Sequence, residues 1–264
     1  MKKLFVLSML AMLFCFFSFA QAADKVVVIP LNSKQPVNAV GQEITSLPYI
    51  ISSPGFYYLG GNLNYAGIEN AITVNADEVT IDLMGNRIAS TNEAGFRKGI
   101  YMHGRKNVEI RNGTISDFSM GIHEDSAAAM GHNVNNIRAL RNYVAISLSG
   151  TNHMVLRCTA SNNSSDGIYV NEGIVSECTA QGGSNRGIDI VNGLIKNCYA
   201  VSNRIGFQIL SGAAIGNVAI GNENYGFLIG SSPALPVLMD QNSAINNGAN
   251  YSGGSPTLGT NAGL

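Results

Sequence analysis

A Gly-Ile dipeptide recurs along this chain at intervals of 19 to 24 residues. Its copies begin at Gly99, Gly121, Gly167 and Gly187, with Ala145-Ile146 in the one gap and Gly206-Phe207 and Gly226-Phe227 continuing the series. A period of this length indicates that one small unit is stacked on the next, because a unit of about 20 residues cannot bury its apolar side by itself. One domain made of such units is the simplest organisation for 264 residues.

Each unit is predicted to contain three short strands. After the Gly, apolar residues such as Ile100 and Met102 alternate with outward-facing ones, which is typical of a strand with one buried face. The Gly would let the chain turn sharply into this strand. Two more apolar segments follow, and no segment keeps a helical period. Because a crossover helix does not fit into about 20 residues, each strand is expected to pair in parallel with its equivalent one coil further on.

Pairs such as Asn162-Asn163 and Asn246-Asn247 precede the next unit and favour a sharp corner, since Asn tolerates a left-handed backbone. Stacked on one another, such Asn residues would form a ladder. Cys158, Cys178 and Cys198 are spaced by the repeat itself, which predicts a stacked, buried and reduced column. Their β-carbons would lie about 4.8 Å apart, too far for the usual disulfide separation of about 3.8 Å.

Three segments carry a resemblance to a known family: VTIDLMGN at residues 79–86, NVEIRNGTI at 107–115 and DGIYV at 166–170. They resemble the right-handed parallel β-helix repeat family, the pectate-lyase-like fold of many secreted bacterial proteins. The resemblance implies an all-β, single-stranded right-handed parallel β-helix, a solenoid of about eight coils, over residues 65–247. Residues 23–64 would be a lead-in that caps its N-terminal end, and residues 248–264, rich in Gly and Ser, a flexible tail.

The first 22 residues are predicted to be a signal peptide that is cleaved after Ala22. Lys2 and Lys3 precede an apolar stretch, and Ala20-Gln21-Ala22 has the small-x-small pattern of a cleavage site. The stretch is too short for a membrane-spanning helix and no second one follows, so no membrane span is expected. We therefore predict a secreted or periplasmic protein.

The charge of the chain gives no reason to expect nucleic acid as a partner. Lys and Arg number 16 against 17 Asp and Glu, two of the lysines lie in the signal segment, and no basic cluster exceeds Arg105-Lys106. No cofactor and no metal site are predicted. Calcium is expected only if the protein acts like the family's lyases.

The first candidate site is His123-Glu124-Asp125, with His103 in nearly the same column one coil earlier and His132 at the end of the loop over residues 126–131. Glu124 stands where other coils carry aliphatic residues. A buried carboxylate without a partner is costly, so either the strand ends early here or Glu124 is paired. Imidazole beside carboxylate also suits proton transfer, which makes these three residues candidates for catalysis.

The second candidate is a strip of outward-facing side chains on successive coils, edged by arginines: Tyr169, Asp189 and Gln208, with Arg186 and Arg204. An aromatic ring beside an amide, an acid and guanidinium groups suits a sugar polymer. The alternative is a solvated face on which Asp166 and Arg186 pair across neighbouring coils.

These patterns leave three functions open. The leading hypothesis is a secreted, non-catalytic protein that binds a polysaccharide or cell-surface glycan at the bacterial surface or in the periplasm. The alternatives are a small polysaccharide-active enzyme, namely a lyase, glycoside hydrolase or epimerase, and a structural or adhesive module. The polygalacturonase-type motifs of the family are absent, which favours the non-catalytic hypothesis, and the lack of Trp weakens any carbohydrate assignment. Neither the glycan nor the oligomeric state follows from the sequence.

Overall fold

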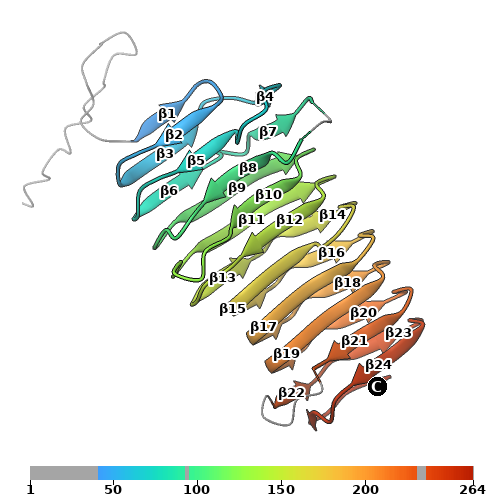
Figure 1. Cartoon of the computed structure of the whole chain (residues 1–264). Helices are drawn as coiled ribbons and strands as arrows, with labels where there is room; N and C mark the ends of the chain where they lie inside the picture. Colours follow the sequence, from blue (N-terminus) through green and yellow to red (C-terminus); the bar gives the residue numbers. More distant parts are fainter. Residues whose placement is uncertain (1–40, 93–94, 231–235, 264) are drawn as a thin grey trace, which may run out of the picture. The chain divides into compact units, whose positions relative to one another are not determined.

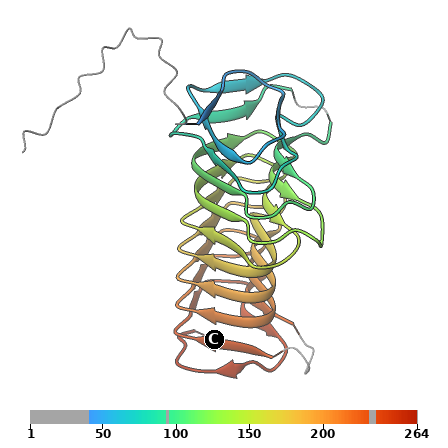
Figure 2. The same cartoon turned by 90° about the vertical axis from the view of Figure 1, so that its left-hand side faces the viewer.

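The computed structural model describes residues 41–92, 95–230 and 236–263, which belong to the unit Ala39–Leu264. The regular elements of these residues are β-strands that pair in parallel, and the chain winds as a right-handed parallel β-helix of about nine turns (Figure 1). Figure 2 shows the coils stacked one upon the next. The described part contains no helix long and apolar enough to cross a membrane. The predicted signal peptide lies outside the described residues.

Each coil contributes to three parallel sheets. The first sheet contains β2 (Tyr49–Ile51), β5 (Ile72–Val74), β8 (Lys98–Met102), β10 (Met120–Glu124), β12 (Val144–Leu148), the first parts of β15 (Ile168–Ser176), β17 (Arg186–Lys196) and β19 (Ile205–Ile215), then β21 (Tyr225–Ile229) and β24 (Ala249–Gly253). The second contains β1 (Gln42–Ile44), β3 (Gly55–Leu59), β6 (Val79–Asp82), the first parts of β9 (Glu109–Ser116) and β11 (Asn133–Leu140), β13 (His153–Leu156), the ends of β15, β17 and β19, β22 (Val237–Asp240) and β25 (Thr257–Leu258). The third contains β4 (Leu63–Tyr65), β7 (Arg87–Ser90), the ends of β9 and β11, β14 (Thr159–Ser161), β16 (Thr179–Gln181), β18 (Tyr199–Val201), β20 (Val218–Ile220) and β23 (Ser243–Ile245).

The predicted apolar column fills the core behind the first sheet. Its members pair in register from coil to coil and are fully buried: Ile100, Ile122, Ile146, Ile168, Ile188, Phe207 and Phe227. The last two rings stack with centroids 4.9 Å apart. Burial of each such side chain contributes about 1.5–3 kcal/mol, so the column accounts for the repeat that the sequence displays.

The glycines of the Gly-Ile repeat serve a different purpose from the one predicted. None of them has the positive φ of a sharp turn. Instead, a β-carbon built on Gly167 would lie 2.4 Å from the carbonyl oxygen of Gly187, and one on Gly187 would lie 2.7 Å from that of Gly206. These glycines therefore permit close stacking of the coils, and the earlier interpretation as turn glycines is wrong.

Two ladders of side chains hold the corners on either side of the third sheet. In one, Asn222 Oδ1 accepts the backbone N–H of Asn203 at 3.0 Å, and Asn247 Oδ1 accepts that of Asn222 at 2.9 Å. In the other, Cys178 Sγ accepts the N–H of Cys158 at 3.4 Å. The cysteines are buried and free, as predicted, and the Cys column continues into an Asn ladder at Asn217.

Both ends of the repeat region extend beyond the predicted limits. Residues assigned to the N-terminal lead-in form β1 to β4, and β2 pairs with β5 as any coil pairs with the next. Residues assigned to a flexible tail form β24 and β25, which pair with β21 and β22. In this segment Tyr251 pairs in register with Phe227, and Asn261 Oδ1 accepts the backbone N–H of Asn242, which extends the ladder that begins at the cysteines.

Candidate functional site

The two predicted groupings lie on one line along the outer face of the first sheet. Neighbouring strands pair these side chains in register, one from each of β8, β10, β12, β15, β17 and β19: Tyr101, His123, Ser147, Tyr169, Asp189 and Gln208. We call these six residues the polar file. At about 4.8 Å per coil the file is about 24 Å long. The register therefore joins two groupings that the sequence presents as rivals.

An acid–base cluster occupies the N-terminal end of the file. It consists of Lys98, Tyr101, His103, His123 and Asp125. Asp125 accepts a hydrogen bond from the Tyr101 hydroxyl at 3.1 Å, and its oxygens lie 2.6 Å from His103 Nδ1 and 3.7 Å from His123 Nε2. The rings of Tyr101 and His123 stack, and Lys98 Nζ lies 4.4 Å from the centroid of the Tyr101 ring.

Three groups of the cluster have shifted pKa values, and each shift favours one protonation state at neutral pH. Burial opposes ionisation of Asp125, but the hydrogen bonds from His103 and Tyr101 outweigh it, so the pKa of Asp125 is lowered. Burial also lowers the pKa of His123, and burial together with Asp125 raises that of Tyr101. One carboxylate thus faces a phenol and a neutral imidazole, and His103, 68% exposed, stands between Asp125 and solvent.

Glu124 lies beneath this cluster and is fully buried. One of its oxygens accepts the backbone N–H groups of Gly104 and Ser126, each at 2.8 Å. The other accepts the N–H of Arg105 at 3.2 Å and lies 3.3 Å from His132 Nε2. Of the two predicted explanations, the pairing of the carboxylate holds, whereas β10 ends at the same register position as β8 and β12 and so does not end early. Of the three predicted catalytic candidates, Glu124 is therefore enclosed by protein groups and does not face solvent.

The same contacts argue against a metal ion. His103, Glu124 and Asp125 each offer a ligand atom within 4.8 Å of the others. However, each Glu124 oxygen already receives two hydrogen bonds, which uses the lone pairs that a metal would need. With one imidazole and one carboxylate left, these residues fit a metal poorly.

The second grouping is less exposed than predicted. Asp189 points away from the core, but only 1% of it is accessible. It lies between Tyr169 and Gln208 on the neighbouring strands and 2.5 Å from Arg186 Nη1. Burial raises its pKa to about 6, against the opposing effect of Arg186. The expectation that Asp189 presents its carboxylate to a ligand is therefore wrong, because its neighbours cover it.

The arginines of the strip differ from each other. Arg186 also pairs with Asp166 across neighbouring coils at 2.7 Å, as the alternative interpretation predicted. Arg204 donates to Asn185 Oδ1 at 2.8 Å, and among the described residues it has no carboxylate partner. Tyr169 and Gln208 are half-buried. Tyr169, Gln208 and Arg204 therefore remain available to a ligand.

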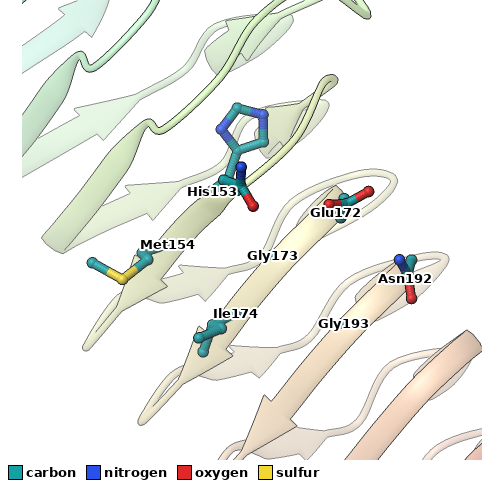
Figure 3. Close-up of a pocket in the computed structure, with 8 residues that line it drawn as sticks. His153, Met154, Glu172, Gly173, Ile174, Asn192 and Gly193 are labelled. Carbon is teal, nitrogen blue, oxygen red and sulfur yellow. The ribbon is translucent and has the colours of Figure 1, made fainter.

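A separate hollow lies at the corner between the first and second sheets. Figure 3 shows Met154 and Ile174 on one side of it and Glu172 and Asn192 on the other, with glycines between. A β-carbon on Gly173 would lie 2.0 Å from the carbonyl oxygen of His153. The glycines that line the bottom of the hollow are therefore explained by the close stacking of the coils. For this reason we place the candidate site on the polar file and not in the hollow.

The sequence singled out neither Lys98 nor Tyr101. The signal was present, because Tyr101 has the same phase relative to its Gly-Ile as Tyr169 has. Lys98 precedes Gly99 as Arg186 precedes Gly187, but only the paired strands show that the two cations share one edge of the sheet.

No protein-family model matches the sequence, and a search of curated proteins finds no match. Solved structures do match. The periplasmic alginate epimerase AlgG is similar with a TM-score of 0.57 and 15% identity, over 81% of this chain and 69% of that one. The Dettilon tailspike protein is similar with a TM-score of 0.56 and 13% identity, over 83% of this chain and 61% of that one. At this identity the likeness concerns the fold alone, and the fold that the chain shares with these structures is the parallel β-helix.

Proposed function

We propose that the polar file is the binding surface for a linear, acidic polysaccharide. The observation that carries the proposal is the alignment of six side chains on six successive coils, because a surface that repeats suits a polymer that repeats. Tyr101 and Tyr169 offer ring faces to sugars. Lys98 and Arg204 have no carboxylate partner among the described residues, which favours an anionic ligand.

The similarity to an alginate epimerase supports the choice of alginate as the first polymer to test. We infer binding without turnover as the primary function, outside the cytoplasm, in line with the signal peptide predicted for residues 1–22. The exposed acid–base cluster at one end of the file gives the alternative, in which the bound polymer is also processed.

Binding is tested by titrating the protein with alginate and with a neutral glucan in a calorimeter. Tyr169→Ala should weaken alginate binding about 2- to 13-fold, which corresponds to the stacking energy of about 0.5–1.5 kcal/mol. Tyr199→Ala is the matched control, since Tyr199 is 51% exposed on β18 of the third sheet. Equal losses in the two variants, or preference for the neutral glucan, would contradict the proposal.

Processing is the second candidate function, and the convergence of Tyr101, His103 and His123 on Asp125 favours it. The test is incubation with uronate and neutral polysaccharides, with and without calcium, while unsaturated products, reducing ends and the sugar configuration are followed. Turnover that His103→Gln reduces at least tenfold would establish the cluster as catalytic. No turnover on any polymer would leave binding as the function.

A further inference from the structure

A chain of three buried titratable residues lies directly beneath the acid–base cluster. Glu124, His132 and His153 are 0–1% exposed. The two imidazole rings stack with centroids 5.0 Å apart and an interplanar angle of 16°. Glu124 Oε2 lies 3.3 Å from His132 Nε2, and His153 Nε2 lies 2.9 Å from the Ser149 carbonyl oxygen. Neither buried histidine takes part in the proposed binding surface.

The hydrogen bonds of these histidines fix their protonation. The backbone N–H of Val108 points to His132 Nδ1, and that of His132 points to His153 Nδ1, each at 3.2 Å. Because a backbone N–H can only donate, both Nδ1 atoms are acceptors and carry no proton. Each Nε2 then carries the proton and donates it, to Glu124 and to Ser149. In the neutral rings every nitrogen takes part in a hydrogen bond. A second proton on either ring would have to bind Nδ1, where it would break a backbone hydrogen bond and bury a charge.

Glu124 connects this chain to the exposed cluster. Along the sequence it stands between His123 and Asp125, and its carboxylate holds the N–H groups of Gly104 and Arg105, which directly follow His103. It also holds the N–H of Ser126, which directly follows Asp125. One buried carboxylate therefore fixes the two segments from which His103 and Asp125 project, and His132 in turn holds that carboxylate.

We propose that Glu124, His132 and His153 form an acid-sensitive latch that positions His103 and Asp125 at neutral pH and releases them when the buried rings gain a proton. The regulatory meaning of the latch rests on the proposed function, because the segments it releases carry His103 and Asp125 of the acid–base cluster, at one end of the polar file. The loop over residues 125–131 is the part that opens. Glu124, His132 and His153 are then positioning residues, and none of them touches the polymer.

The groups around the rings act in opposite directions, because the facing imidazole favours the neutral state of His153 and the nearby carboxylate of Glu124 opposes it. The charged and titratable groups are Glu124 from β10, the facing imidazole, Glu172 from β15 at the rim of the hollow, and Arg105, whose guanidinium lies 3.8 Å from Asp77. Burial and the neighbouring His132 lower the pKa of His153 to about 4, against the smaller effects of the Ser149 carbonyl and Glu124. A proton gained by His153 therefore favours the open loop.

Hydrogen exchange of the full chain without polysaccharide tests the latch directly. After correction for intrinsic exchange rates, the opening constant of the loop amides should rise about tenfold per pH unit as the pH falls from 6.5 to about 4. Amides of β19 and β21 should show no such rise. In His132→Asn/His153→Asn the slope should vanish, because Asn Oδ1 accepts the same backbone N–H without titrating, as Asn217 does for Cys198. His103→Asn, an exposed control, should keep the wild-type slope.

A flat wild-type slope, or a slope that the double variant retains, would overturn the latch. If the double variant does not fold, NMR titration of the wild-type imidazoles decides instead, and an ordinary pKa near 6.5 for His153 would also overturn it. Alginate titrations at pH 7 and pH 5 form a separate arm: weaker binding at pH 5 in the wild type, lost in the double variant, supports regulation. If alginate binds at neither pH, the proposed function fails while the exchange data still decide the latch.

Discussion

Among single residues, Asp189 shows most clearly what a buried charge does in this fold. Its folded-state pKa is raised from the ordinary 3.8 to about 6 by burial. A carboxyl with a raised pKa contributes stability that is fully present below pH 3.8 and is lost as the pH rises to about 6. The cost grows by about 1.4 kcal/mol per pH unit in that window. One of its oxygens is buried and has no hydrogen-bond partner among the described residues.

Asp189→Asn should therefore remove this dependence. Relative to the wild type, the free energy of unfolding of the variant should gain about 1.4 kcal/mol per pH unit between pH 4 and 6, as measured by urea denaturation at several pH values. The comparison cancels the titration of His153, which both proteins share. Asp166→Asn is the control and should destabilise, since it removes the better-placed partner of Arg186. Parallel pH curves for wild type and Asp189→Asn would contradict the assignment.

Asp189 also shows which features of the candidate site can be predicted from the sequence and which cannot. Alternation along β17 correctly predicts that Asp189 points away from the core, because that depends only on the phase of the strand. It cannot predict that Tyr169 and Gln208 cover the carboxylate together with Arg186, since these two side chains lie about 20 residues away on neighbouring strands. For Glu124 the apolar pattern predicts a buried carboxylate that needs a partner. It does not identify the partners, because the N–H groups of Gly104 and Arg105 come from the preceding coil.

At the scale of elements, the corner ladders replace the hydrogen bonds that strand ends would otherwise lack. Asn222 accepts from the backbone and side chain of Asn203 and donates to the Ala200 carbonyl oxygen. Asn222→Ala should lower the free energy of unfolding by about 1–3 kcal/mol because buried partners lose their hydrogen bonds. Asn192→Ala, at an exposed position on β17, should change it by less than about 0.5 kcal/mol. Thermal or urea unfolding measures both, and similar values for the two would speak against the ladder.

The cysteine column makes a second prediction at this scale. Burial raises the pKa of the Cys158 and Cys198 thiols, and the column is enclosed by the corner. A thiol reagent should therefore label Cys158, Cys178 and Cys198 slowly in the native protein and modify all three only after denaturation. A mass two hydrogens lower per pair in the untreated protein would show a disulfide and contradict the prediction.

For the molecule as a whole, the Gly-Ile period predicts the architecture but not its ends. The outermost strands, β2 and β24, lack the dipeptide, so the recurring Gly-Ile does not mark them. The extent of the β-helix is therefore defined by the strands that pair in register and not by the recurring dipeptide. The same registration joins two separate polar groupings into one file, whose six residues each directly follow the Ile or Phe of the repeat.

A file that spans six coils makes a prediction about ligand length that a compact pocket does not. If the polymer lies along the file, affinity for alginate oligomers should rise with length until the oligomer covers about 24 Å, and then level off. Tyr101→Ala and Tyr169→Ala lie three coils apart, so a short oligomer should be sensitive to one of them and a long oligomer to both. Calorimetric titration of a size series measures this. An affinity independent of length, or a short oligomer equally sensitive to both variants, would place the ligand in one pocket and not along the coils.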